Sequence, residues 1–109
     1  MEHVLLRFYV HESHRLHWKP FWEWLLTEAS KMGIAGGSAF RAMAGFGEHH
    51  TLHEDRFFEL QGASTVAVEF IVTEGEAARL IERVSREKVR ALYALIPARW
   101  GVIGGQPDK

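Results

Sequence analysis

The residues best suited to chemistry lie between positions 45 and 55, which read GFGEHHTLHED. Gly45 and Gly47, on either side of Phe46, permit backbone turns that aim successive amide groups at an anion. Arg41, on the segment just before, would add positive charge. A site for phosphate or another small anion is therefore the first of three interpretations of this stretch.

The histidines of the same stretch allow the other two interpretations. His49 and His53 are four positions apart and would share one face of a helix, where His50 could join them as a ligand of zinc or copper. A Gly-Phe-Gly start seldom begins a helix, however, and no cysteine is available to fix the geometry. The last interpretation is a structural turn followed by solvated histidines.

Two further side chains are candidates for ligand contacts. Lys19 directly precedes Pro20, which suits the first turn of a helix, and a helix N-terminus favours an anion. A solvated lysine is the alternative. Glu12 would either cap the turn or helix that follows the first predicted strand, or accept a hydrogen bond from a ligand sugar.

Composition limits the classes of function. Thirteen basic and fourteen acidic side chains give the 109 residues a net charge of −1, which provides no global field for nucleic acid. Without cysteine, disulfides and thiolate metal sites are excluded. No stretch approaches the roughly 18 apolar residues of a membrane span. We predict a cytoplasmic protein with one domain over residues 1–104 and a disordered tail over residues 105–109.

Alternation of apolar and β-branched residues predicts four strands, over residues 3–10, 38–44, 64–72 and 91–103. Pro97 interrupts the last strand and therefore belongs at a sheet edge or a bulge.

Spacings of three and four predict two helices. The first runs from Trp18 to Met32 and ends at Gly33, and its three tryptophans are too many for one buried stripe. The second follows a capping-box sequence, residues 73–76, and buries Ala77, Leu80, Ile81 and Val84.

The order of these elements predicts an α+β protein with the ferredoxin-like βαββαβ fold: a four-stranded antiparallel sheet with both helices on one face. Even-numbered strand residues, Phe40 included, are expected to face the helices, and odd-numbered ones, Arg41 included, to face away. The second face is too apolar to remain exposed to solvent. Arg7 and Glu69 are expected to form an ion pair on it. We predict that this face is a subunit interface.

The connection between the middle strands, roughly residues 45–63, is much longer than the usual hairpin loop of about 2 to 5 residues. Three of its large apolar residues, Phe57, Phe58 and Leu60, are expected to pack on the body of the protein or on a neighbouring subunit.

Four segments in this order resemble the signatures of the PII-like family catalogued as domain-of-unknown-function family 190. They are LRFYVHE at 6–12, KPFWE at 19–23, GIAGGSAFRAMAGFG at 33–47, and LH at 52–53. The resemblance covers about residues 4–72 well and the remainder loosely.

The resemblance implies a homotrimer of ferredoxin-like subunits, in which the long loop corresponds to the regulatory loop of PII signalling proteins. PII proteins bind adenine nucleotides in clefts between subunits and use that loop to contact transporters or enzymes, and members of family 190 are associated with genes for fluoride-export channels. We therefore expect a regulatory protein that binds an adenine nucleotide or a similar small anion, and whose partner is a membrane transport protein such as a fluoride channel, or an enzyme.

In this interpretation the phosphates lie near the amides of residues 45–47 and near Arg41 and Lys19, while His53 and Glu12 contact the ribose or the base.

No set of residues fits a nucleophilic mechanism, because the serines lie in no pattern with a base and an orienting acid. We predict that the protein is not an enzyme and requires no cofactor. The alternatives are a small ferredoxin-like oxygenase or isomerase that holds an aromatic substrate, and a metal-binding protein of the CutA type.

Overall fold

The computed structural model describes residues 3–45 and 64–104. The strands are β1 (His3–His11), β2 (Arg15–Leu16), β3 (Lys19–Pro20), β4 (Ser38–Arg41), β5 (Thr65–Thr73) and β6 (Leu92–Pro97). The helices are α1 (Phe21–Lys31) and α3 (Glu74–Ser85). No helix in the described ranges is long and apolar enough to cross a membrane.

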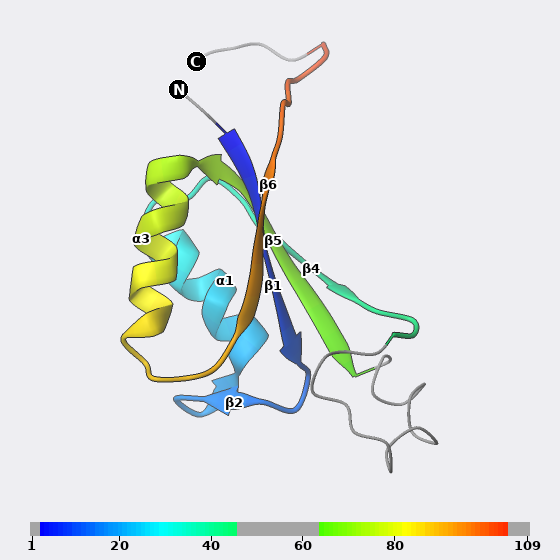
Figure 1. Ribbon diagram of the computed structural model, residues 1–109, viewed down its shortest axis with the longest axis vertical. Helices are drawn as coiled ribbons and strands as arrows, with labels where there is room; N and C mark the ends of the chain where they lie inside the picture. The colour runs from blue at the N-terminus through cyan, green and yellow to red at the C-terminus, as the bar shows by residue number, and fades with distance from the viewer. Residues whose placement is uncertain (1–2, 46–63, 105–109) are drawn as a thin grey trace.

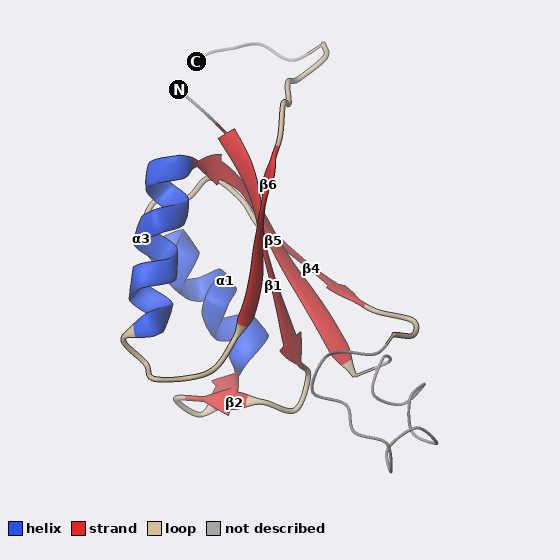
Figure 2. Ribbon diagram, viewed as in Figure 1, coloured by secondary structure: helices blue, strands red, loops and turns tan. Residues whose placement is uncertain are grey.

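Four of the strands form one antiparallel sheet in the order β4-β5-β1-β6. Both helices lie on the same face of this sheet, and the other face is left open (Figures 1 and 2). The predicted ferredoxin-like βαββαβ class is therefore confirmed, including the long connection between β4, which ends at Arg41, and β5, which begins at Thr65. The hairpin of β2 and β3 is an addition between β1 and α1.

The core lies between the helices and the two central strands. Alternate residues of β1 and β5 are buried because successive side chains of a strand point to opposite faces. The buried strand residues are Val4, Leu6, Phe8, Val10, Val66, Val68, Phe70 and Val72, and the helices bury Phe21, Trp24, Leu25, Ala29, Ala77, Leu80 and Val84 against them. Each large side chain contributes about 1.5–3 kcal/mol when fully buried.

Helix α3 begins at the predicted capping box. The Thr73 hydroxyl accepts a hydrogen bond from the Glu76 amide at 3.1 Å, and the Glu76 carboxylate accepts one from the Thr73 amide at 3.0 Å. Because each side chain satisfies a backbone amide that the helix would otherwise leave unpaired, the chain turns directly from β5 into the helix.

Helix α1 begins at Phe21, later than predicted, and the assignment of Trp18 to this helix was wrong. Lys19 and Pro20 pair with Arg15 and Leu16 as a short hairpin, and Pro20 is the N-cap of the helix. Trp18 lies in the hairpin turn, with 93% of its surface exposed. The helix ends at Lys31 with Met32 as its C-cap, and the predicted stop, Gly33, follows with a φ of 87° that suits glycine.

The predicted faces of β4 were also wrong. Its register places Phe40 opposite Ala67, on the open face, and Arg41 opposite Val66, on the side of the helices. A shift of one residue exchanges the faces of a strand, and the four residues of β4 carry too little alternation to fix the register. The strand ends at Arg41, three residues earlier than the predicted Ala44.

The last strand is shorter than predicted as well. β6 ends at Pro97, and residues 98–103 are not a strand. Pro97 has no amide hydrogen to donate, and β6 is an edge strand, which confirms the predicted edge position of this proline.

Gly37 provides a test of how tightly the sheet packs on α1. A methyl group at this position would overlap the ring of buried Phe70 and lie 3.2 Å from Leu26. We expect Gly37→Ala to lower the free energy of unfolding by about 1–3 kcal/mol, the usual cost of overpacking a core. The neighbouring Gly36 has open space where a methyl group would lie, so Gly36→Ala is the matched control. If urea denaturation gave the two variants the same free energy of unfolding, the result would contradict this packing.

Candidate functional site

The centre of the open face holds the predicted ion pair. Arg7 of β1 and Glu69 of β5 are direct cross-strand partners, and the Arg7 Nε donates to the Glu69 carboxylate at 2.7 Å. Arg7 also donates to the Tyr9 hydroxyl at 3.1 Å. The hydrogen bonds to Tyr9 and Glu69 raise the pKa of Arg7, so a fixed positive charge stays beside the carboxylate. The polar centre thus lies within an otherwise apolar face.

A pocket of about 510 Å³ opens on this face beside Glu69. Its apolar walls come from Leu5, Phe40, Ile71 and Trp100, and the backbone of residues 35–38 forms another side. The two aromatic residues are half exposed, Phe40 by 55% and Trp100 by 53%. The volume lies within the roughly 300–1,000 Å³ of small-molecule sites, and the lining suits a flat aromatic group that donates a hydrogen bond to a carboxylate.

Trp100 reaches this pocket from beyond the end of β6. The Ala98 amide donates to the His3 carbonyl at 3.3 Å, which holds the chain against the start of β1. The His3 and Trp100 rings then form a T-shaped contact, with the ring centroids 5.5 Å apart. The segment after β6 is therefore anchored where it can cover the pocket.

A second polar group lies at the other end of β4. Arg41 forms an ion pair with Glu12, which directly follows β1, and the Arg41 side chain is 64% exposed. The Glu12 amide donates to the Ser64 carbonyl at 2.6 Å, and the Ala42 amide donates to the Thr65 carbonyl at 2.9 Å. The ends of three strands therefore meet where the chain enters and leaves residues 46–63.

The structure brings together some of the predicted site residues. Arg41 and Glu12 are in contact, and Gly45 lies four positions beyond Arg41. Lys19 belongs to the separate hairpin sheet, and the ion pair of Glu12 and Arg41 does not include it. The remaining candidates lie outside the described residues: Phe46, Gly47, His49, His50, His53, Phe57, Phe58 and Leu60.

Comparison with known proteins identifies the family of this chain. The family described as "Uncharacterized ACR, COG1993", domain-of-unknown-function family 190, matches residues 3–99. The chain belongs to this family.

Two individual proteins resemble this family 190 chain. It is 34% identical, over 80 residues, to a UPF0166 protein of Aquifex aeolicus (strain VF5), and the match covers 73% of this chain and 76% of that relative. A crystal structure of a protein from Thermus thermophilus, provisionally described as a PII-like signalling protein, superposes with a TM-score of 0.52. That pair is 20% identical over 86% of this chain and 84% of the other, a similarity that supports the fold.

Sequence reasoning missed the pocket of this family 190 chain. Gly36 and Gly37 stand before an edge strand, where a close backbone approach is typical. Phe40 was assigned to the wrong face, and Trp100 was placed within a strand. The glycine pair was the available signal, but the aromatic walls come together only through the register of β4 and the path of the chain after β6.

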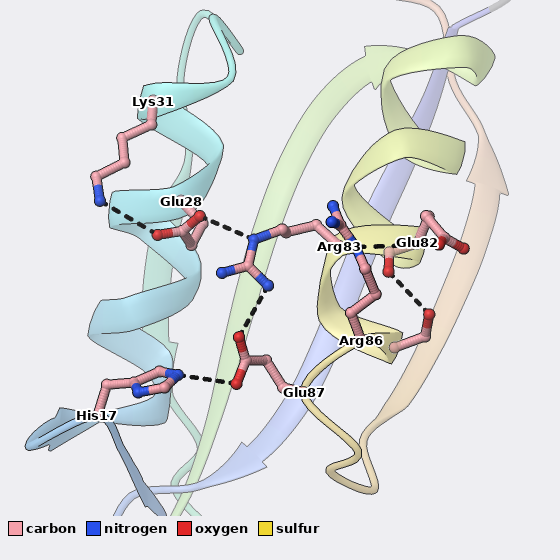
Figure 3. A network of polar contacts seen from close by, with 8 residues as sticks. His17, Glu28, Lys31, Glu82, Arg83, Arg86 and Glu87 are labelled. Carbon is pink, nitrogen blue, oxygen red and sulfur yellow. Dashed lines mark hydrogen bonds and ion pairs between the residues drawn. The ribbon is translucent and has the colours of Figure 1, made fainter.

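A network of charged side chains joins the hairpin to both helices (Figure 3). His17 of the hairpin contacts Glu87 at 2.8 Å, and Arg83 of α3 donates to Glu87 at 2.8 Å and to Glu28 of α1 at 3.2 Å. Arg83 also lies over the Trp24 ring, 5.0 Å from its centroid. The hydrogen bonds from Arg83 and His17 lower the pKa of Glu87. Among the described residues, no group of three acidic or histidine side chains could hold a metal ion.

The lowered pKa of Glu87 predicts a pH-dependent contribution to stability. A carboxyl group whose pKa is lower when folded stabilises the fold above its unfolded pKa, near 4.5, and loses that contribution as the pH falls through its folded value. We expect Glu87→Gln to lower the melting temperature at pH 7 and to converge with the original protein in strong acid. Glu23→Gln, at an exposed position of α1, is the control. A difference in melting temperature that stays constant from pH 7 to pH 3 would contradict this role of Glu87.

Proposed function

We propose that this family 190 protein is a cytoplasmic, non-catalytic PII-like regulator that binds an adenine nucleotide or a similar small anion at the border between subunits. One observation carries the proposal: an aromatic pocket that contains a carboxylate lies at one end of β4, and an exposed arginine at the root of the long connection lies at the other end. The first suits a base and the second suits a phosphate.

The pocket offers the contacts that a purine base needs. The half-exposed rings of Phe40 and Trp100 provide faces for stacking, an interaction that every base can make. Glu69 keeps acceptor capacity beyond its bond from Arg7, because an ionised carboxylate has about four lone-pair sites. An exocyclic amine of the base is the donor that this carboxylate would select.

The phosphate end of the ligand is matched by Arg41. A strand rises about 3.3 Å per residue, so Ser38 at the pocket and Arg41 are about 10 Å apart along β4, comparable with the length of a nucleoside monophosphate. Because Arg41 lies on the helix side of the sheet, such a ligand would reach it around the outer edge of β4. The arginine is largely exposed and can offer a forked guanidinium to phosphate oxygens. We propose that backbone amides of residues 45–47, where the sequence predicts a turn, also bind the phosphate, and that His53 contacts the ribose or base.

Ligand binding would act on the long connection through Glu12. A phosphate at Arg41 competes with the Glu12 carboxylate for the same guanidinium, and charge-assisted bonds to phosphate are strong. Glu12 is also hydrogen-bonded through its amide to Ser64, at the end of that connection. Ligand binding would thereby change the conformational preference of the long connection. We propose that this segment contacts a membrane transport protein, such as a fluoride channel, or an enzyme.

The open face supports assembly into a homotrimer. Five of its large side chains are between 36% and 55% exposed: Tyr9, Phe40, Ile71, Leu92 and Ile96. An apolar face of this kind is typical of an interface, and a ring of three needs one heterologous contact that closes. Because β4 is an edge strand, a neighbouring subunit would meet the sheet beside the pocket.

The nucleotide site is tested by calorimetry with adenosine, AMP, ADP, ATP and inorganic phosphate. We expect at least one nucleotide to bind and Arg41→Ala to weaken it roughly ten-fold or more, because a charge-assisted hydrogen bond contributes about 1.5–3 kcal/mol. Trp100→Ala should weaken the binding of nucleotide and of adenosine alike, since stacking contributes about 1–3 kcal/mol per base. Arg41→Ala should leave adenosine binding unchanged.

Trp18→Ala is the matched control for this experiment, because Trp18 is exposed on the hairpin, away from the pocket. Flat titrations with every ligand at millimolar concentration would reject the proposed function. Nucleotide binding that survives both Arg41→Ala and Trp100→Ala would reject the placement of the site.

The assembly is tested by light scattering at micromolar concentration. We expect a mass three times that of the 12.5 kDa chain. Leu92→Glu should yield smaller species, because it places a charge on the apolar face, whereas Val102→Glu, beyond β6, should not. A stable monomer of the unmodified protein would exclude the trimer.

A further inference from the structure

The turn of the β2–β3 hairpin has an unfavourable backbone conformation. Its two central residues, His17 and Trp18, have φ angles of 53° and 73°. Hairpin turns with two positive φ angles strongly prefer asparagine and glycine, and a bulky residue in this region is an outlier. Strain of this kind persists where the surrounding structure enforces it, and it is concentrated at functional positions.

The strained turn presents an indole to solvent. Trp18 is 93% exposed, although a side chain of this size is usually well buried. The indole is carried on a fixed support: the Arg15 guanidinium donates to the Trp18 carbonyl at 2.7 Å, and His17 contacts Glu87 at 2.8 Å. The His14 ring also packs on buried Phe21, with the centroids 4.8 Å apart. An anchor held in this way loses little further freedom when it binds.

The hairpin tip and the turn beside it are rich in basic residues. Residues 14–20 include Arg15 and Lys19 and no acidic residue. The turn after α3 adds Arg86, Lys88 and Arg90, and its one acid, Glu87, is already engaged by Arg83 and His17. The contact between His17 and Glu87 places this turn beside the hairpin (Figure 3). Lys88 is the third described non-glycine residue with a positive φ, so all three lie at this end of the molecule.

We propose that this hairpin tip is a peripheral membrane anchor: Trp18 inserts among the headgroups of an anionic bilayer, while Arg15, Lys19 and Lys88 contact lipid phosphates and carboxylates. Tryptophan is enriched at the membrane interface because its ring is apolar and its N–H is polar, and anionic leaflets attract basic residues. This interaction surface is separate from the nucleotide pocket and goes beyond the function proposed above.

A bilayer fits the tip better than a protein partner does. The indole projects from a two-residue turn, whereas a stable protein interface buries roughly 1,200–2,000 Å² of combined surface. A single projecting ring with flanking cations provides little area but can enter the headgroup layer. A soluble partner would have to supply an acidic surface around a pocket that receives the indole.

The test is co-sedimentation of the full chain with vesicles of phosphatidylcholine alone and with vesicles that also contain phosphatidylserine. We expect binding to the anionic vesicles only, weakening as sodium chloride is raised, because salt screens exposed charges. Trp18→Ala should lower the partition coefficient at least ten-fold. Trp100→Ala, which alters the other strongly exposed described tryptophan, should not change it.

A second variant separates binding from folding. Trp18→Gly should lose vesicle binding while its melting temperature equals or exceeds that of the original protein, because glycine adopts a positive φ without strain. No binding to anionic vesicles, or equal binding by Trp18→Ala, would overturn the proposal. Binding to poly-glutamate but not to vesicles would likewise overturn it and assign the tip to an acidic protein. Because nucleotide titration of the same variants is a separate measurement, failure of the anchor would not be confused with failure of the nucleotide site.

Discussion

The structure depends on the one-sided burial of its two central strands. β1 and β5 place one set of alternate residues in the core, and the two helices can cover only that face. The other set is left on an open face whose charged centre is the Arg7–Glu69 pair. The pocket, its carboxylate and the proposed subunit interface all lie on that face, so the same alternation that builds the core also creates the surface on which we propose that ligand and neighbouring subunit bind.

The second organising feature is the meeting of strand ends at Glu12, Arg41 and Ser64. Arg41 can pair with Glu12 or with an anion, but a single guanidinium fork does not serve both fully. Because Glu12 is bonded through its backbone to Ser64, exchange of partners at Arg41 would be transmitted to the long connection. In the proposed function, a local competition between two anions at Arg41 would link a small ligand to the segment proposed to contact a protein.

Much of the fold could be predicted because its signals are local. The alternation in β1 and β5 and the capping box at Thr73 each lie within a few residues, and the Arg7–Glu69 pair follows once the two strands are adjacent. The predictions failed where contacts between residues far apart in the sequence determine the local structure. The short strand β4 takes its register from β5, which reversed the faces of Phe40 and Arg41. Trp18 fits a helical spacing, yet the pairing of Lys19 and Pro20 with Arg15 and Leu16 removes it from the helix. The pocket escaped notice because Trp100 reaches it from outside the strands.

A two-dimensional nitrogen-proton NMR titration with ATP would show whether the open-face pocket and the end of β4 form one ligand site. We predict shifts that saturate together for the backbone amides of Gly36, Gly37 and Phe40, the indole N–H of Trp100, and the side-chain Nε–H of Arg41, with the Trp18 indole unchanged. Saturable shifts confined to the hairpin or to the outer surface of the helices, with the pocket residues unaffected, would contradict the account.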